Sequence, residues 1–148
     1  MTKPCYICDR IEKIKQNDNP FFVTELKTGY VVMGFHQYFR GYTLFMCKEH
    51  KNELHELEPS FRLEFLKEMS DVAAAVYRAF KPKKMNYELL GNEESHMHWH
   101  LIPRYGTDPV PGDSIWSLDK KTLDEYTISS DSPELEELKT LLKKELSK

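Results

Sequence analysis

The sequence predicts an α+β fold in which an antiparallel five-stranded sheet carries a long helix on one face, followed by a C-terminal helix. Residues 59–80 repeat apolar side chains with a helical period, and five shorter apolar segments bounded by turn residues favour strands. The order strand-strand-strand, long helix, strand-strand is typical of an antiparallel sheet covered by helices. A length of 148 residues corresponds to about one domain, so we expect residues 1–148 to form a single domain.

The first part of the chain predicts a short helix and a hairpin. A helix is expected from Asp9 to about Gln16, where the Asn17-Asp18-Asn19-Pro20 cluster ends it. Lys27-Thr28-Gly29 separates two β-prone runs, and glycine accepts the positive φ that a tight turn requires. The five expected strands are residues 21–26, 30–35, 42–47, 85–90 and 97–103.

Two helices have clear boundary signals. Pro59 suits the first turn of the long helix, and Lys81-Pro82 ends it. The apolar side chains that form its core-facing stripe are Phe61, Phe65, Met69, Val72, Val76 and Phe80. Residues 132–148 predict an amphipathic C-terminal helix, with acidic residues early and lysines late, as the helix dipole favours.

The overall composition excludes several classes of protein. The net charge of −3 supplies no broad positive field, so we expect no nucleic-acid polymer and no anionic membrane as partner. No apolar run approaches the roughly 18–20 residues of a membrane helix. The first ten residues contain no apolar signal-peptide core, which predicts a cytoplasmic protein.

The most informative segment is His96-Met97-His98-Trp99-His100-Leu101-Ile102. In a strand, alternate residues share a face, so we expect the three imidazoles in one row at a spacing of about 6.6 Å. This spacing suits contacts along a phosphate chain, and mutual repulsion is expected to lower the pKa values of the imidazoles. Two alternatives remain: a metal site made of histidines alone, and a polar strand face without function.

The cysteines predict a metal site near the N-terminus. Cys5-x-x-Cys8 lacks the preceding strand of a thioredoxin-like redox motif, and an odd count of three cysteines argues against a full disulfide framework. Zinc requires four ligands, and spacing alone offers Cys47 and His50 as the other two. Two free thiols on an N-terminal arm are the alternative.

The histidine segment resembles the His-φ-His-φ-His-φ-φ signature of the histidine triad (HIT) superfamily. The segments 41–50 and 85–92 are similar to the strands that precede the signature in that family, and the likeness extends over roughly residues 5–116. The resemblance implies a HIT-like fold and a homodimer. It also implies cleavage at the α-phosphate of dinucleoside polyphosphates, nucleoside phosphoramidates or related adenylates.

The resemblance assigns roles to individual residues. His98 is expected to attack the α-phosphorus and form a covalent nucleotidyl-histidine that water hydrolyses or a second acceptor takes over. His100 is expected to bind a phosphoryl oxygen. The loop that holds the same phosphate, through its backbone N–H groups, is expected to include Gly91, Asn92 and Ser95.

The resemblance also suggests a zinc-ligand set that differs from the one offered by spacing. In the zinc-bearing branch of the family, an N-terminal cysteine pair joins a histidine after the third strand and the first histidine of the triad. Here these residues are Cys5, Cys8, His50 and His96. We prefer this set, because it places a structural zinc ion in an N-terminal knuckle, residues 1–20, beside the active site.

The nucleoside side of the family pattern is altered in this chain. Gly41-Tyr42 stands where many members have a Gly-His pair, and Gly34 stands where they have an acidic or amide residue for the ribose. With a shift of one or two residues, His36 or Gln37 takes that place. Aromatic residues that could stack on a base are Phe35, Tyr38, Phe39 and Trp116.

Two further functions stay open at this point. A binding module with the same fold would sense adenine nucleotides without turning them over. A structural zinc protein with an unused pocket would gain no stability from nucleotides. The test that separates these functions is incubation with a panel of nucleotide substrates.

Overall fold

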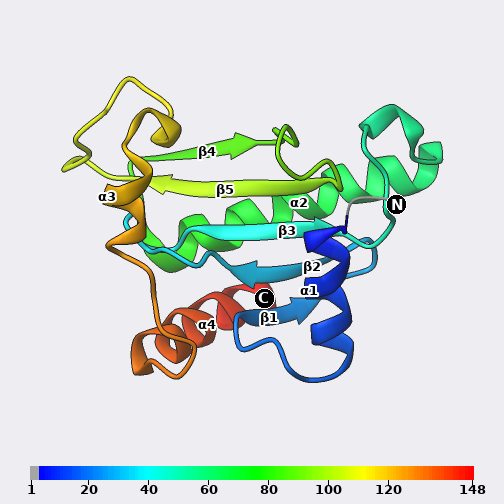
Figure 1. Cartoon of the computed structure of the whole chain (residues 1–148), viewed down its shortest axis with the longest axis horizontal. Coiled ribbons are helices and arrows are strands. Elements are labelled where there is room, and N and C mark those ends of the chain that lie inside the picture. Colours follow the sequence, from blue (N-terminus) through cyan, green and yellow to red (C-terminus); the bar gives the residue numbers. More distant parts are fainter. Residues whose placement is uncertain (1–3) are drawn as a thin grey trace.

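The computed structural model describes residues 4–148 and has an α+β fold (Figure 1). Five antiparallel strands form one open sheet in the order β1-β2-β3-β5-β4. The predicted fold class is therefore confirmed. The strands are β1 (Phe22–Glu25), β2 (Gly29–Met33), β3 (Thr43–Cys47), β4 (Lys84–Glu88) and β5 (His98–Arg104).

The helices are α1 (Tyr6–Lys15), α2 (Pro59–Phe80), α3 (Lys120–Asp124) and α4 (Pro133–Leu146). Helix α2 has the bounds that the sequence predicts. The Glu58 carboxylate accepts from the first free N–H groups of α2, and Lys81 ends the helix in the left-handed region with φ of +51°. No helix within residues 4–148 is long and apolar enough to cross a membrane.

Helix α1 begins at Tyr6, three residues earlier than the sequence predicts. The Cys5 thiol caps the helix, because its Sγ accepts a hydrogen bond from the backbone N–H of Cys8 at 3.2 Å. Cysteine is not among the residues that usually signal a helix start. The cysteine pair therefore lies at the first turn of α1, and residues 1–3 of the predicted knuckle lie outside the described residues.

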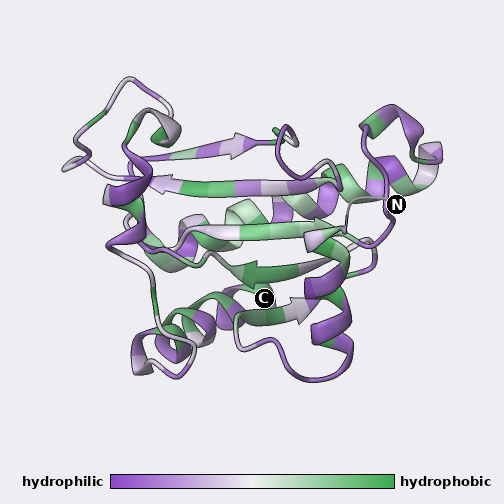
Figure 2. Ribbon diagram, in the orientation of Figure 1, coloured by the Kyte–Doolittle hydropathy of each residue, from purple (hydrophilic) through white to green (hydrophobic). Residues whose placement is uncertain are grey.

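One face of the sheet packs against α2 and α4 and forms the main core. Strand β5 contributes Trp99 and Leu101 to this core, β3 contributes Phe45 and Cys47, and α2 contributes Phe65. Figure 2 shows the hydrophobic residues along the central strands β2 and β3. Because side chains alternate along β5, His98 and His100 project from the opposite face.

The opposite face carries two smaller apolar clusters. One joins α1 to the sheet and consists of Ile7, Ile11, Ile14, Tyr30, Val32 and Met46. The other lies beneath α3 and consists of Phe39, Tyr42, Ile102, Ile115 and Leu123. In Figure 1, α1 and α3 lie in front of opposite ends of the sheet. The histidine strand β5 crosses the region between them.

Candidate active site and metal centre

His98 is the first residue of β5, and its imidazole is held by the backbone. Nδ1 lies 2.8 Å from the carbonyl oxygen of His96. A carbonyl oxygen only accepts hydrogen bonds, so Nδ1 carries the hydrogen and Nε2 carries the lone pair. This geometry fixes the tautomer that a nitrogen nucleophile requires.

His100 lies beside His98, with the ring centroids 4.9 Å apart. Its Nδ1 is 2.7 Å from the Tyr42 hydroxyl, and Trp116 packs edge-on against its ring at 5.3 Å. Burial lowers the pKa of His100 to about 3, with a smaller contribution from repulsion by His98 and His36. The prediction that repulsion lowers the pKa is therefore corrected: desolvation is the main cause.

Trp116 forms one wall beside the histidines. It lies in the 3-10 turn Ile115–Ser117, is 41% exposed, and donates its indole N–H to the Glu88 carboxylate. Ser114 donates to the same carboxylate at 3.3 Å. The ring is thus held against His100 while one side of it stays accessible.

His96 lies just before β5, and its ring is on the same face of the sheet as His98 and His100, as the alternation predicts, because Met97 packs into the core on the α2 face and His96 contacts α1. Nε2 of His96 lies 2.7 Å from the carbonyl oxygen of Cys47 and donates to it. Its Nδ1 lone pair is directed at the cysteine pair of α1, 3.5 Å from Cys5 Sγ and 3.4 Å from Cys8 Sγ. Burial is the main cause that lowers the pKa of His96 and keeps the ring neutral.

Four side chains from three distant parts of the chain meet at this point. The ligand atoms of Cys5, Cys8, His50 and His96 all lie within 4.8 Å of one another. Nδ1 of His50 is 3.1 Å from Nδ1 of His96 and 3.3 Å from Cys8 Sγ. The structure therefore brings together the ligand set that the resemblance suggests.

This cluster fits a tetrahedral zinc ion. Zn–S bonds of about 2.3 Å and Zn–N bonds of about 2.0–2.1 Å separate neighbouring ligand atoms by roughly 3.3–3.8 Å. Four of the six separations in the cluster are 3.1–3.5 Å, and all six are within 4.8 Å. Desolvation and the neighbouring Cys5 raise the pKa of the Cys8 thiol to about 11. A cation is then needed to hold two thiolates side by side.

Cys47 does not belong to this cluster. Its side chain is fully buried in the core on the α2 face, and burial raises the pKa of its thiol to about 11. Only its backbone carbonyl reaches the site, where it accepts from His96. The Cys₃His set offered by spacing is therefore not formed.

The loop between β4 and β5 lies directly before the triad. Gly91 has φ of +77°, which explains the glycine, and Asn92 and Ser95 are exposed. The Glu94 carboxylate accepts from the backbone N–H of Tyr6 at 3.2 Å and ties the loop to α1. Phosphate binding by this loop stays a prediction.

Gly34 and Gln37, two of the residues considered for ribose binding, make contacts inside the protein instead. A Cβ on Gly34 would lie 2.3 Å from the Tyr42 ring, so this glycine makes room for the tyrosine. The Gln37 amide is buried, donates to the carbonyls of Gly34 and Tyr42, and accepts from Gly41 N–H. Gln37 is therefore not free for a ribose. Nδ1 of His36 is buried without a hydrogen-bond partner among residues 4–148.

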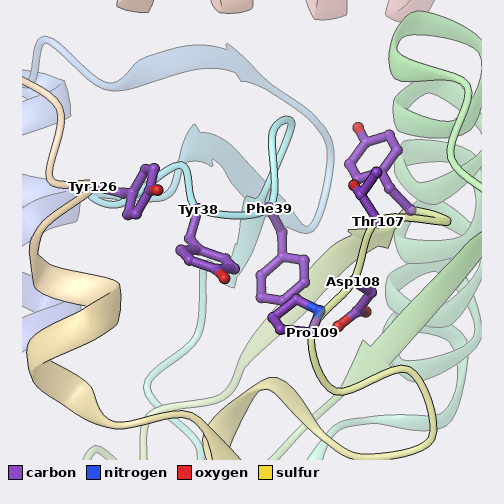
Figure 3. A pocket seen from close by; sticks show the side chains of 7 residues that line it. Tyr38, Phe39, Thr107, Asp108, Pro109 and Tyr126 are labelled. Carbon is purple, nitrogen blue, oxygen red and sulfur yellow. The ribbon is translucent and has the colours of Figure 1, made fainter.

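A cavity of about 160 Å³ lies away from the histidines, near the end of β5. It is lined by Tyr38, Phe39, Tyr105, Thr107, Asp108, Pro109 and Tyr126. Figure 3 shows Tyr38 and Phe39 between Tyr126 on one side and Pro109 and Asp108 on the other. Asp108 forms a buried ion pair with Arg104. Arg104 lies six residues after His98, which is roughly 20 Å along the strand. Tyr38 and Phe39 therefore line a space separate from the triad.

The model of the HIT domain family matches residues 16–107, more than half of the chain. The chain belongs to the histidine triad family. It is 28% identical over 92 residues to the protein hit of Bacillus subtilis (strain 168), a match that covers 59% of this chain and 61% of that protein. The chain thus matches about three fifths of the length of this curated relative.

Solved structures of the histidine triad family share the fold. A histidine triad protein from Bradyrhizobium japonicum superposes with a TM-score of 0.71 at 19% identity, covering 90% of this chain and 94% of the other. A zinc-bound histidine triad family protein from Mycobacterium smegmatis has a TM-score of 0.66 at 19% identity, covering 97% and 93%.

Proposed function

We propose that the protein is a nucleotidyl hydrolase or transferase that acts through His98. The carrying observation is the 2.8 Å hydrogen bond from His98 Nδ1–H to the His96 carbonyl, which leaves the lone pair on Nε2. The proposed substrates are dinucleoside polyphosphates, nucleoside phosphoramidates or related adenylates. Membership of the histidine triad family supports this class of substrate.

In the proposed reaction, Nε2 of His98 attacks the α-phosphorus and forms an N–P bond. The bond from phosphorus to the leaving group breaks in the same step, and the leaving group departs with its electron pair. Water then attacks the phosphorus of the nucleotidyl-histidine, forms an O–P bond and releases a proton, while the N–P bond breaks and its electron pair returns to Nε2 of His98. A second phosphate in place of water gives transfer instead of hydrolysis.

The charge that develops on the phosphoryl oxygens requires fixed donors. His100 is neutral near pH 7, so it offers one N–H, and it lies next to His98 on the same face of β5. In this proposal the loop residues Gly91, Asn92 and Ser95 supply further backbone N–H groups. Donors that need no rearrangement stabilise such a transition state strongly.

The proposal assigns a structural zinc ion to Cys5, Cys8, His50 and His96. The fit of the donor set and the zinc-bound relative from Mycobacterium smegmatis support this assignment. When bound, zinc would fill all four positions with protein ligands and leave none for chemistry. The proposal includes a knuckle of residues 1–20 within a single domain of residues 1–148. A homodimer and a cytoplasmic location stay predictions.

His96 links the two parts of the proposed site. Its Nδ1 belongs to the ligand cluster, its Nε2–H donates to the Cys47 carbonyl, and its own carbonyl accepts from His98. A metal ligand held by such an outer hydrogen bond keeps its tautomer and orientation. The metal centre would thereby hold the backbone group that orients the nucleophile.

The test is incubation of the zinc-loaded protein with diadenosine polyphosphates, adenosine phosphoramidate and sugar nucleotides, with products identified by mass. Turnover that is lost in His98→Ala and retained in His55→Ala supports the proposal, because His55 is an exposed histidine in the turn Leu54–Glu56. Tight nucleotide binding without turnover would contradict it and favour a binding module. No effect of nucleotides on activity or stability would favour a structural zinc protein.

A further inference from the structure

Tyr42 occupies the position where many members of the family have a histidine, and its ring is tightly enclosed. Gly41 precedes it with φ of +96°, a conformation that glycine accepts readily. Gly34 lies against the ring, where any side chain would collide with it. Tyr42 is 5% exposed, belongs to the apolar cluster of Phe39, Ile102, Ile115 and Leu123, and packs against the His36 ring with the centroids 4.9 Å apart. The ring therefore has one position available.

That position places the hydroxyl on His100. The oxygen lies 2.7 Å from Nδ1, and the two rings are nearly parallel, with an interplanar angle of 17°. Burial raises the pKa of the Tyr42 phenol well above its ordinary value, and burial lowers the pKa of His100 to about 3. A neutral phenol therefore meets a neutral imidazole.

The surroundings of the phenol decide the direction of this hydrogen bond. A hydroxyl that donates to Nδ1 satisfies its own hydrogen. Within residues 4–148 the hydroxyl has no hydrogen-bond partner other than His100 Nδ1, so a hydroxyl that accepts from Nδ1–H leaves its own hydrogen unpaired between the His36 ring and the apolar cluster. Leaving a buried donor unsatisfied costs about 1–3 kcal/mol, so donation by Tyr42 is favoured.

We propose that Tyr42 is a positioning residue that holds His100 in the tautomer with its hydrogen on Nε2. This inference rests on the proposed function, in which His100 donates to a phosphoryl oxygen. With the hydrogen on Nδ1, Nε2 would present a lone pair to that oxygen and repel it. The Tyr42 hydroxyl excludes this arrangement by occupying Nδ1 as a donor.

His98 and His100 then carry opposite tautomers, each suited to its task. The His96 carbonyl accepts from Nδ1–H of His98 and leaves a lone pair on Nε2 for attack. The Tyr42 hydroxyl donates to Nδ1 of His100 and leaves an N–H on Nε2 for the phosphate. The His96 carbonyl, an acceptor, and the Tyr42 hydroxyl, a donor, thus give the two adjacent imidazoles different tautomers.

The direct test is the tautomer of His100 in the zinc-loaded, ligand-free protein. Long-range ¹H–¹⁵N correlation spectra at pH 7.5 should show the hydrogen on Nε2 in the wild type. In Tyr42→Phe, which keeps the ring and loses the hydroxyl, the signals should move toward the Nδ1–H form. Tyr38→Phe removes a hydroxyl from the same loop and should leave the spectrum unchanged.

Kinetics test the consequence for the reaction. Removing one donor to a transition-state oxygen typically lowers kcat about 10²–10³-fold. Because Tyr42→Phe leaves the Nε2–H tautomer reachable, we expect a smaller loss of about tenfold in kcat, with KM changed less than about twofold. Tyr38→Phe should keep both constants.

Two results would overturn the inference. One is an unchanged His100 tautomer in Tyr42→Phe, and the other is a changed tautomer with an unchanged kcat. The spectra need no substrate, so they decide the role of the Tyr42 hydroxyl even if the substrate panel shows no turnover. Failure of the proposed function is therefore distinguishable from failure of this inference.

Discussion

The buried, neutral state of His100 predicts a measurable dependence of stability on pH. Burial lowers its pKa from 6.5 to about 3 in the folded protein, whereas the unfolded chain keeps an ordinary histidine. The stabilising effect is therefore complete above pH 6.5 and is lost as the pH falls toward 3. Between pH 7.5 and 5.5 the unfolded state takes up about one proton at His100 that the folded state refuses.

The magnitude follows from this difference in proton binding. For an unfolded pKa of 6.5, the free energy of unfolding should fall by about 1.4 kcal/mol between pH 7.5 and 5.5. A folded pKa anywhere near 3 gives the same value, since the folded ring stays neutral over that range. In His100→Gln, an amide can still meet the Tyr42 hydroxyl, and this part of the pH dependence should vanish.

The assay is urea unfolding of both proteins at the two pH values with saturating zinc. Contributions from histidines that do not interact with His100 are shared by both proteins and cancel in the comparison. We expect the wild type to lose about 1.4 kcal/mol more than His100→Gln on acidification. Equal losses would refute the assignment of a neutral, buried His100.

Three further predictions concern the metal centre, the hairpin and the nucleoside. Cys5→Ser should lose the zinc ion, measured by metal analysis, and should have a lower melting temperature, although serine is a good N-cap. Cys47→Ser should keep the zinc ion. Loss of zinc from Cys47→Ser would contradict the ligand set. Glu68→Ala should lower the free energy of unfolding by about 2–4 kcal/mol in urea titrations, because the buried carboxylate accepts from Lys27 N–H, Thr28 N–H and the Thr28 hydroxyl. Glu68→Gln should lower this free energy less. An alanine variant as stable as the wild type would contradict this role of Glu68. Adenosine and guanosine substrates with one leaving group should differ by less than about tenfold in kcat/KM, since no ribose-binding side chain stands at Gly34; a preference of several hundredfold would refute this.

Local sequence patterns predict the long helix and the sheet well. The period of the apolar residues, Pro59 and Lys81-Pro82 together give α2 its observed bounds. The strands lie within about two residues of their predicted ranges, because turn residues bound them clearly. The helix α3, in contrast, has only five residues, and no apolar period of that length stands out in the sequence.

The site depends on contacts that local patterns do not contain. The alternation of the strand gives the face on which His96 lies, but the nearby sequence does not show that its ring contacts Cys5, which is 91 residues away along the chain. The cap formed by Cys5 also moves the start of α1. The sequence shows that Tyr42 replaces the histidine of the Gly-His pair found in many members of the family. Only the packing of the tyrosine ring shows that its hydroxyl reaches His100.

The central claim is that His98 forms a covalent bond to the nucleotide. The most direct measurement is mass spectrometry of zinc-loaded protein, quenched during turnover of adenosine phosphoramidate and digested under conditions that preserve phosphoramidates. We predict an adenylyl group on His98 that is absent from His98→Ala and enriched in variants that slow hydrolysis. Rapid turnover with no adduct on His98, or unimpaired turnover by His98→Ala, would contradict the account.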